Sequence, residues 1–153
     1  MTGSSVHIQD FILKEISGYG KLSVNYPLSS AATFKTGGAA DYFFEPFDEE
    51  SAVKAVSILK SENIELHIIG GGSNLLVSDK GLRGFVVRIS SEQTGIEEID
   101  DLIYASASVS KEKFISNSID KGYGGVEFMA GIPGSIGGGI YMNAGTFMGS
   151  FSG

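Results

Sequence analysis

The chain has 153 residues, enough for one domain of ordinary size or two small subdomains, and its lack of cysteine excludes disulfides, thiolate metal sites and cysteine nucleophiles. A net charge of −7, from 11 basic and 18 acidic residues, argues against nucleic acid and anionic membranes as partners. No apolar run approaches the ~20 residues of a membrane span, and the opening MTGSSVHIQDF lacks the basic and the apolar region of a signal peptide. The cysteine-free composition suits a reducing cytosol, so we expect a cytoplasmic protein.

The N-terminal half predicts a helix and then a β-α-β unit. Hydrophobic spacing favours a short amphipathic helix over 11–16, and SGYGKLSVNYPLSS (17–30) has the composition of a loop. DYFFE (41–45) is typical of a strand, and Asp48 is the expected N-cap of a helix that ends near Glu62. IELHII (64–69) predicts a second strand, parallel to the first and joined to it by a right-handed crossover.

Three consecutive glycines follow this second strand, in IIGGGSNLLVSDKG (68–81). The loop leaves the carboxyl end of a parallel strand, where α/β folds usually bind ligands. It is not a Rossmann loop, because a helix should follow such a loop and LLV (75–77) favours a strand. It is not a P-loop, because that motif needs Gly-Lys-Ser or Gly-Lys-Thr and neither occurs in the sequence. The amides from Gly71 to Asn74 predict an anion nest without a lysine, with a structural turn as the alternative. A turn at SDKG and a strand GFVVRI (84–89) follow.

The C-terminal half begins with a polar, acidic stretch, SSEQTGIEEIDD (90–101), interpreted as a connection. LIYASASV (102–109) alternates like a strand with one buried face. Ser110 is the expected N-cap of a helix over 111–121, with Val109 and Phe114 as a hydrophobic staple and Gly122 as the C′ residue.

A second glycine-dense stretch, GVEFMAGIPGSIGGGIYMNAGTF (125–147), follows. It predicts a helix that begins near Ser135 and leaves its first amides free for an anion, although close packing through a glycine face explains the spacing almost as well. We expect Glu127 to anchor a loop by accepting backbone hydrogen bonds, and His67 to be a partly buried structural residue. No residue of the chain is assigned a catalytic role.

Three stretches of the chain follow the order of the landmark motifs of one family. They are TFKTGGAADYFFEP, IIGGGSNLLVSDKGLRGFVVRI and the second glycine stretch. Over residues 33–147 the chain resembles the UDP-N-acetylenolpyruvoylglucosamine reductases, the MurB flavoenzymes of peptidoglycan synthesis. The resemblance implies an α+β, two-subdomain, non-Rossmann FAD-binding fold (PCMH/VAO-like) with FAD between the subdomains. We expect a lead-in over 1–30, a first subdomain over 31–90, an incomplete second subdomain over 91–153, and no C-terminal substrate-binding domain.

The resemblance also implies a non-covalent FAD. Its pyrophosphate would lie against Gly71 to Asn74 and against Gly134 and Ser135, and the residues from Met129 to Gly131 would lie near the isoalloxazine ring. The full set of expected cofactor-binding residues is Gly70, Gly71, Gly72, Ser73, Asn74, Leu75, Met129, Ala130, Gly131, Gly134, Ser135 and Gly138.

The activity implied by the resemblance is reduction of FAD by NADPH, followed by hydride transfer to the enolpyruvyl group of the UDP-sugar to give UDP-N-acetylmuramate. The family's proton-donating Ser, its Arg and its catalytic Glu belong to sequence beyond Gly153, so we expect this chain alone to be inactive. Thr146-Phe147-Met148 departs from the family's usual Ala-Tyr-Gly. The alternatives are an FAD-dependent oxidase of the same fold, weakened because the first loop lacks a His for flavin attachment, and a binding module that has lost its flavin.

Overall fold

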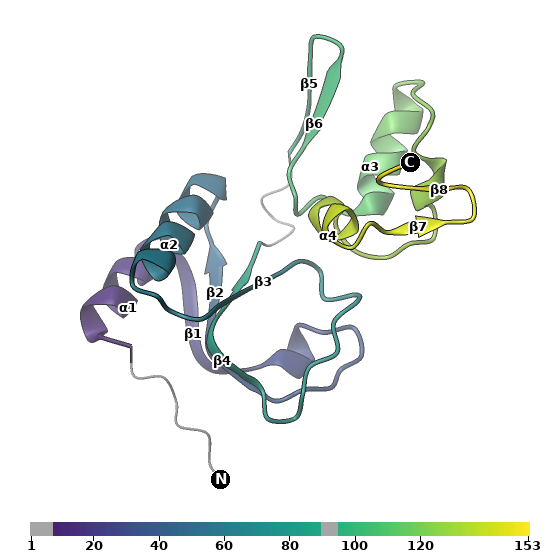
Figure 1. The fold of residues 1–153 in the computed structure, drawn as a ribbon. Coiled ribbons are helices and arrows are strands. Elements are labelled where there is room, and N and C mark those ends of the chain that lie inside the picture. The colour runs from purple at the N-terminus through teal and green to yellow at the C-terminus, as the bar shows by residue number, and fades with distance from the viewer. Residues whose placement is uncertain (1–7, 90–94) are drawn as a thin grey trace. The chain divides into compact units, whose positions relative to one another are not determined.

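The computed structural model describes residues 8–89 and 95–153 of the chain, and Figure 1 shows its helices and strands. The chain divides into two compact units, Met1–Ile89 and Ser90–Gly153, called here the first and second unit. Part of the sequence considered for a signal peptide, and the start of the acidic connection, lie outside the described residues.

The first unit is built on a four-stranded sheet. Its elements are α1 (Asp10–Ser17), β1 (Gly20–Pro27), η1 (Leu28–Ser30), β2 (Ala39–Pro46), α2 (Glu49–Ser61), β3 (Leu66–Ile69) and β4 (Leu82–Arg88). The strand order is β1-β2-β4-β3, with β1 antiparallel to β2 and both β2 and β3 parallel to β4. The two predicted helices are confirmed, as are the parallel strands of the β-α-β unit, between which β4 inserts.

Two predictions for the first unit are wrong. Residues 17–30 are not a loop, because β1 runs through them; Leu22, Val24 and Tyr26 alternate along it and pair with β2. Residues 75–77 do not form a strand but an irregular segment. Val77 is buried there because it packs against the backbone at Gly37, so its hydrophobicity serves contact between two loops and not strand pairing.

The sheet of the first unit separates two hydrophobic clusters. On one face α1 and α2 cover buried residues of β2 and β4, among them Phe44 and Phe85. On the other face Phe43 and Val86 pack against η1 and the loop that contains Val77. The glycine loop after β3 (residues 70–81) therefore belongs to a layer of irregular chain that covers this second face, as Figure 1 shows.

A β-bulge interrupts the pairing of β2 with β4. Ala40 lies opposite Leu82 but Tyr42 lies opposite Phe85, so β4 carries one extra residue. Gly84 occupies the bulge with a φ of 77°, and a Cβ there would lie 2.3 Å from the Glu65 carbonyl oxygen. The buried Asp41 carboxylate accepts the Gly84 N–H at 3.1 Å and pairs with Arg83 at 2.7 Å, which fixes the extra residue.

The second unit consists of small elements. They are β5 (Ile96–Ile99), β6 (Leu102–Ala105), α3 (Lys111–Asp120), η3 (Glu127–Met129), α4 (Ile136–Tyr141), β7 (Gly145–Thr146) and β8 (Gly149–Ser150). β5 pairs only with β6, and β7 only with β8, among the described residues. The acidic connection is thus partly strand, contrary to the prediction, because Ile96–Ile99 pairs with β6; β6 itself ends at Ala105, short of the predicted Val109.

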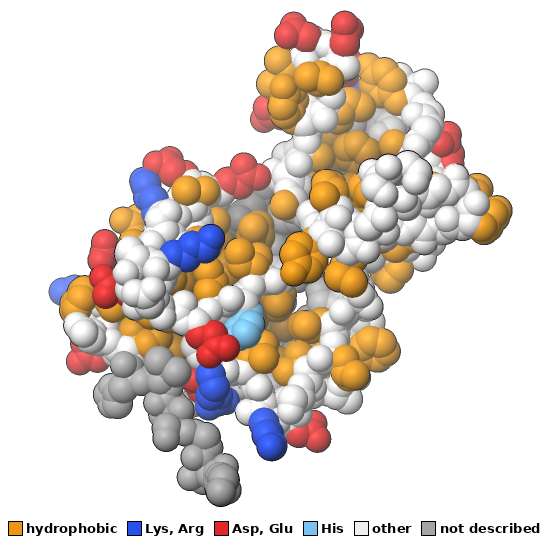
Figure 2. All heavy atoms as spheres, viewed as in Figure 1, with side chains coloured by type: hydrophobic (Ala, Val, Ile, Leu, Met, Phe, Trp, Pro, Cys, Tyr) orange, Lys and Arg blue, Asp and Glu red, His pale blue; other side chains and the backbone are white. Residues whose placement is uncertain are grey.

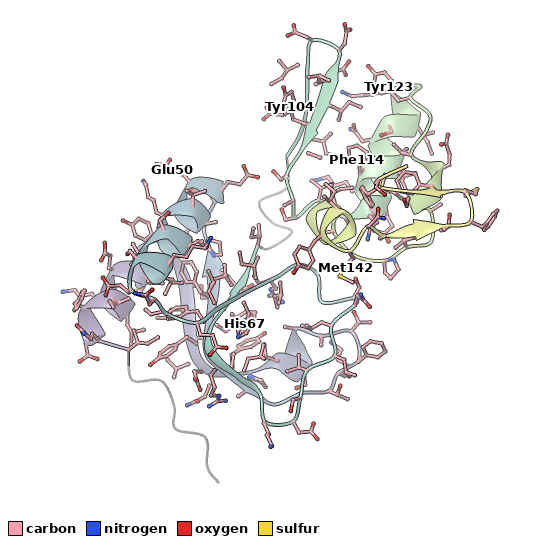
Figure 3. The ribbon with its side chains drawn as sticks, in the orientation of Figure 1. Glu50, His67, Tyr104, Phe114, Tyr123 and Met142 are labelled. Atoms are coloured by element: carbon pink, nitrogen blue, oxygen red, sulfur yellow. The ribbon has the colours of Figure 1, made fainter. Side chains whose placement is uncertain are left out.

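Helix α3 matches its predicted termini. The Ser110 hydroxyl accepts the Lys113 N–H at 3.2 Å, and Val109 and Phe114 pack in one cluster. Gly122 has a φ of 78°; its N–H donates to Ile119 and the next N–H donates to Ser118, which is the Schellman pattern. Figure 3 labels Phe114 in this helix and Tyr123 just beyond its C-terminal end.

The second unit leaves much apolar surface uncovered. Its core cluster contains only three buried residues among those described: Val109, Met129 and Ile136. One face of the β5–β6 hairpin exposes Ile99, Leu102 and Tyr104. Figure 2 shows hydrophobic surface on this hairpin next to its acidic tip. In neither unit does the described part of the chain contain a helix long and apolar enough to cross a bilayer.

Candidate functional site

The first glycine tract extends from the carboxyl end of β3, as predicted. Gly71 and Asn74 are exposed, Ser73 is half-buried, and Gly72 is buried with a φ of 71°. Within the described residues, the N–H groups of Gly71, Gly72 and Asn74 donate no hydrogen bond to the chain. A run of backbone donors around a left-handed residue is the arrangement that binds oxygen anions.

Gly72 also has a structural reason to be glycine. A Cβ there would lie 2.0 Å from the carbonyl oxygen of Ala31, and the Gly72 carbonyl accepts the Thr33 N–H at 3.0 Å. The tract is therefore held against residues 31–33, a contact that the sequence analysis did not predict. Bare backbone at position 72 is required by packing as well as by any ligand, so a substitution at this residue would perturb both.

The second tract contains the predicted helix start. Ser135 is the N-cap of α4, and its hydroxyl accepts the Gly138 N–H at 3.2 Å. Immediately before it, Gly131 and Gly134 have φ values of 78° and 105°, and among the described residues no hydrogen bond from their N–H groups to the chain is found. The turns at 131 and 134 therefore present unused backbone donors.

The prediction that the first amides of α4 are free is wrong. The N–H of Ile136 donates to the Val109 carbonyl at 2.8 Å, and the N–H of Gly137 donates to the Ala107 carbonyl at 2.9 Å. A Cβ at Gly137 would lie 2.7 Å from the Cβ of Ala107, so this glycine permits close approach of α4 to the segment after β6. The glycines inside α4 thus follow the packing interpretation, and an anion would have to use the turns before the helix.

The other predicted residues differ in accessibility. Ala130 and Gly131 are exposed, whereas the Met129 side chain is 2% exposed and belongs to the core of the second unit. Leu75 is half-buried against the second cluster of the first unit, and Gly70 is half-buried at the end of β3. A flavin near residues 129–131 would therefore contact Ala130 and Gly131 more readily than the Met129 side chain.

Two further residues behave as the sequence predicts. Glu127 accepts the Gly125 N–H at 2.7 Å, which makes it a loop anchor. His67 is partly buried on β3, with Nε2 3.5 Å from a carboxylate oxygen of Glu65; Figure 3 shows it in that strand. No group of three or more His, Cys, Asp and Glu side chains that could hold a metal ion occurs among the described residues.

Each unit, taken by itself, has donors that fit the phosphate groups of a cofactor. Unused amides at residues 71, 72 and 74 in the first unit, and at residues 131 and 134 in the second, are suited to phosphate oxygens, and both groups lie in loops whose glycines admit close approach. With an acidic chain, such amides can bind an anion without a cluster of basic side chains.

The fold and these loops define an α+β FAD-binding protein. The chain belongs to the FAD binding domain family, whose profile matches residues 40–153 and so includes both glycine tracts. Membership confirms the predicted fold class and FAD as the cofactor.

The relatives are more specific. Over 135 residues the chain is 41% identical to the UDP-N-acetylenolpyruvoylglucosamine reductase of Caldanaerobacter subterraneus subsp. tengcongensis, covering 88% of this chain and 44% of that one. The Bacillus subtilis reductase of the same name is 36% identical, with 90% and 45% covered. The crystal structure of UDP-N-acetylenolpyruvylglucosamine reductase (MurB) from Thermus caldophilus matches with a TM-score of 0.65 and 26% identity, covering 86% of this chain and 44% of that one. The predicted resemblance is confirmed, and the chain spans less than half the length of these relatives.

Proposed function

We propose that this chain is the FAD-binding portion of a UDP-N-acetylenolpyruvoylglucosamine reductase, an oxidoreductase that uses NADPH in cytoplasmic peptidoglycan synthesis. The supporting observation is the family match over residues 40–153, which spans both loops with unused backbone donors. The names of the relatives support the choice of a reductase over an oxidase or a module without flavin.

In this proposal the twelve cofactor-binding residues expected from the sequence serve one FAD. The N–H groups of Gly71, Gly72 and Asn74, and those of Gly131 and Gly134, are assigned to the pyrophosphate because none of them donates a hydrogen bond within residues 8–89 and 95–153. Ala130 and Gly131 offer exposed backbone to the flavin. The bound cofactor would supply hydride transfer between NADPH and the enolpyruvyl group of the UDP-sugar.

This chain's own contribution is binding and orientation. We propose no proton donor in it: Glu127 is engaged with the Gly125 N–H, and Ser135 is engaged as a helix cap. A general acid typically contributes 10²–10⁴-fold to such a reaction. Residues 1–153 should therefore bind FAD without catalysing substrate-dependent NADPH oxidation.

The test of FAD binding is titration of the purified chain with FAD and with FMN, followed by acid precipitation. We expect FAD to bind more tightly than FMN and to appear in the supernatant. Preference for FMN, or flavin that stays with the pellet, would contradict the proposal.

The position of the pyrophosphate is tested at Asn74, which is exposed, so its substitution disturbs no packing. Asn74→Asp places a negative charge near the anion without a change in size; at ~4 Å and an effective dielectric near 20, such a pair is worth roughly 4 kcal/mol. Asn74→Ala removes at most one hydrogen bond, about 1 kcal/mol. FAD affinity should fall much further in Asn74→Asp than in Asn74→Ala. Equal affinities would place the pyrophosphate elsewhere.

A further inference from the structure

Lys111 is a buried lysine that the proposed function does not use. It is the first residue of α3, and only 3% of it is exposed. Its Nζ donates to the Pro133 carbonyl at 2.8 Å, while its own N–H donates to the Gly134 carbonyl at 3.0 Å. One residue thus holds two successive carbonyls of the turn that leads to Ser135.

The lysine side chain occupies space that a glycine leaves open. A Cβ at Gly139 would lie 2.7 Å from the Lys111 Cε, so the aliphatic stem runs along the bare backbone of α4. Lys111 therefore links the start of α3, the Pro133–Ser135 turn and the inner face of α4.

Stability alone does not account for a charge at this position. Burial disfavours the ammonium form and lowers the pKa of Lys111, with the exposed Glu112 acting in the opposite direction. A cation in the first turn of a helix also meets the positive end of the helix dipole. Across residues 8–89 and 95–153, no carboxylate lies within 4.0 Å of this ammonium. A methionine would fill the same slot without these costs.

We propose that Lys111 is a positioning residue for the FAD pyrophosphate: it fixes the Pro133–Ser135 turn through two hydrogen bonds and supplies positive charge from behind that turn. The inference rests on the proposed FAD site. The anion compensates the buried cation, and the cation offsets the repulsion between an acidic chain and a doubly charged pyrophosphate.

The experiment compares Lys111→Met with Lys113→Met in the full chain. Lys113 is exposed on the same helix, so its substitution makes the same change in net charge at a solvent-accessible position. FAD, ADP and riboflavin are titrated by fluorescence or calorimetry, and the thermal midpoint of each protein without ligand is measured by circular dichroism.

We expect Lys111→Met to raise the Kd for FAD and ADP roughly 10- to 100-fold, leave riboflavin binding unchanged, and unfold at the same or a higher temperature than the wild type. Lys113→Met should bind FAD within about threefold of the wild type. A lower thermal midpoint with equal loss of riboflavin and FAD would make Lys111 merely structural, and wild-type FAD affinity in Lys111→Met would also overturn the inference.

Lys111→Gln, which keeps a donor but loses the charge, provides a second variant. Its FAD affinity should lie between those of the wild type and Lys111→Met. If both variants fail to fold, Lys111 is a stability residue and the inference is wrong. If the wild-type chain binds no FAD, the proposed function fails first, and the two failures are thereby distinguished.

Discussion

The two units differ in how their structure is held together. The first unit has a four-stranded sheet with eight buried residues in one cluster and seven in the other, whereas the second unit has two separate hairpins and a cluster of three, counted over the described residues. Caps, turns and hydrogen bonds between residues close in sequence define much of the second unit, as at Ser110 and Glu127. A segment can thus have well-formed local structure with a small core, and its local geometry then says little about its independent stability.

The largest expected effect concerns separation of the units. A polypeptide of residues 1–89 should unfold cooperatively, because its sheet is covered on both faces. Residues 90–153 alone should show no cooperative transition, because the three buried hydrophobic residues of the core cluster cannot offset the conformational entropy of the segment. Thermal unfolding followed by near-ultraviolet circular dichroism measures both, with the full chain as control. A sharp transition in residues 90–153 would remove the contrast between the units.

A smaller effect distinguishes two glycines that share a left-handed conformation. Gly122 has a φ of 78°, and a Cβ at this position would meet no atom within 4 Å, so Gly122→Ala should cost about 1–2 kcal/mol. Gly72→Ala adds a clash with the Ala31 carbonyl and should cost roughly 3 kcal/mol or more. Denaturant unfolding of both variants gives the comparison. Equal losses would mean that conformation, and not crowding, explains both glycines.

The smallest expected effect is an ionisation coupling in the second unit. Glu98 on β5 accepts hydrogen bonds from Lys121 and from the Tyr123 hydroxyl, each at 2.6 Å. The Glu98 hydrogen bond raises the pKa of Tyr123 above its ordinary value of 10.0. Glu98→Gln should therefore lower the pH at which Tyr123 ionises, as followed by NMR of ring-labelled tyrosine. Glu97→Gln, on the opposite face of the hairpin, is the matched control and should leave this titration unchanged.

The same hydrogen bonds also make the stability of the hairpin depend on pH under acidic conditions. The hydrogen bond from Lys121, and then that from Tyr123, hold the pKa of Glu98 below its ordinary value of 4.5. A lowered pKa stabilises the folded form above the unfolded value, so this contribution is lost as the pH falls from about 4.5 through the lowered value. Amide exchange in β5 and β6 should accelerate over that range in the wild type and stay flat in Glu98→Gln. An unchanged acid response in the variant would assign the effect to another carboxylate.

The sequence predicted what depends on neighbours along the chain. The helix caps at Asp48 and Ser110 and the Schellman end at Gly122 follow from residue types at fixed spacing, and all three are present. β1 was missed because its Gly and Pro termini and exposed positions obscure the alternation of its hydrophobic residues.

Contacts between distant segments could not be predicted. Neither the approach of Ala31 to Gly72 nor the donation of α4 amides to the carbonyls of Ala107 and Val109 leaves a pattern in the local sequence. These contacts decide which amides of the two glycine tracts remain available. The two glycine tracts of the candidate site were therefore predictable from the sequence, whereas the individual donors were not.

The bulge at Gly84 constrains how the chain can change in length. Because side chains alternate between the faces of a strand, one extra residue ahead of Phe85 determines that Phe85 and Val87 meet the helices while Val86 meets the loops. Removal of a single residue at the bulge would exchange these faces. The Phe85 ring would then lie on the face covered by loops, where Val86 now packs. A deletion at the bulge should thus be rejected by evolution, whereas substitutions of the exposed side chains of Asp79 and Lys80, a few residues earlier, should be tolerated.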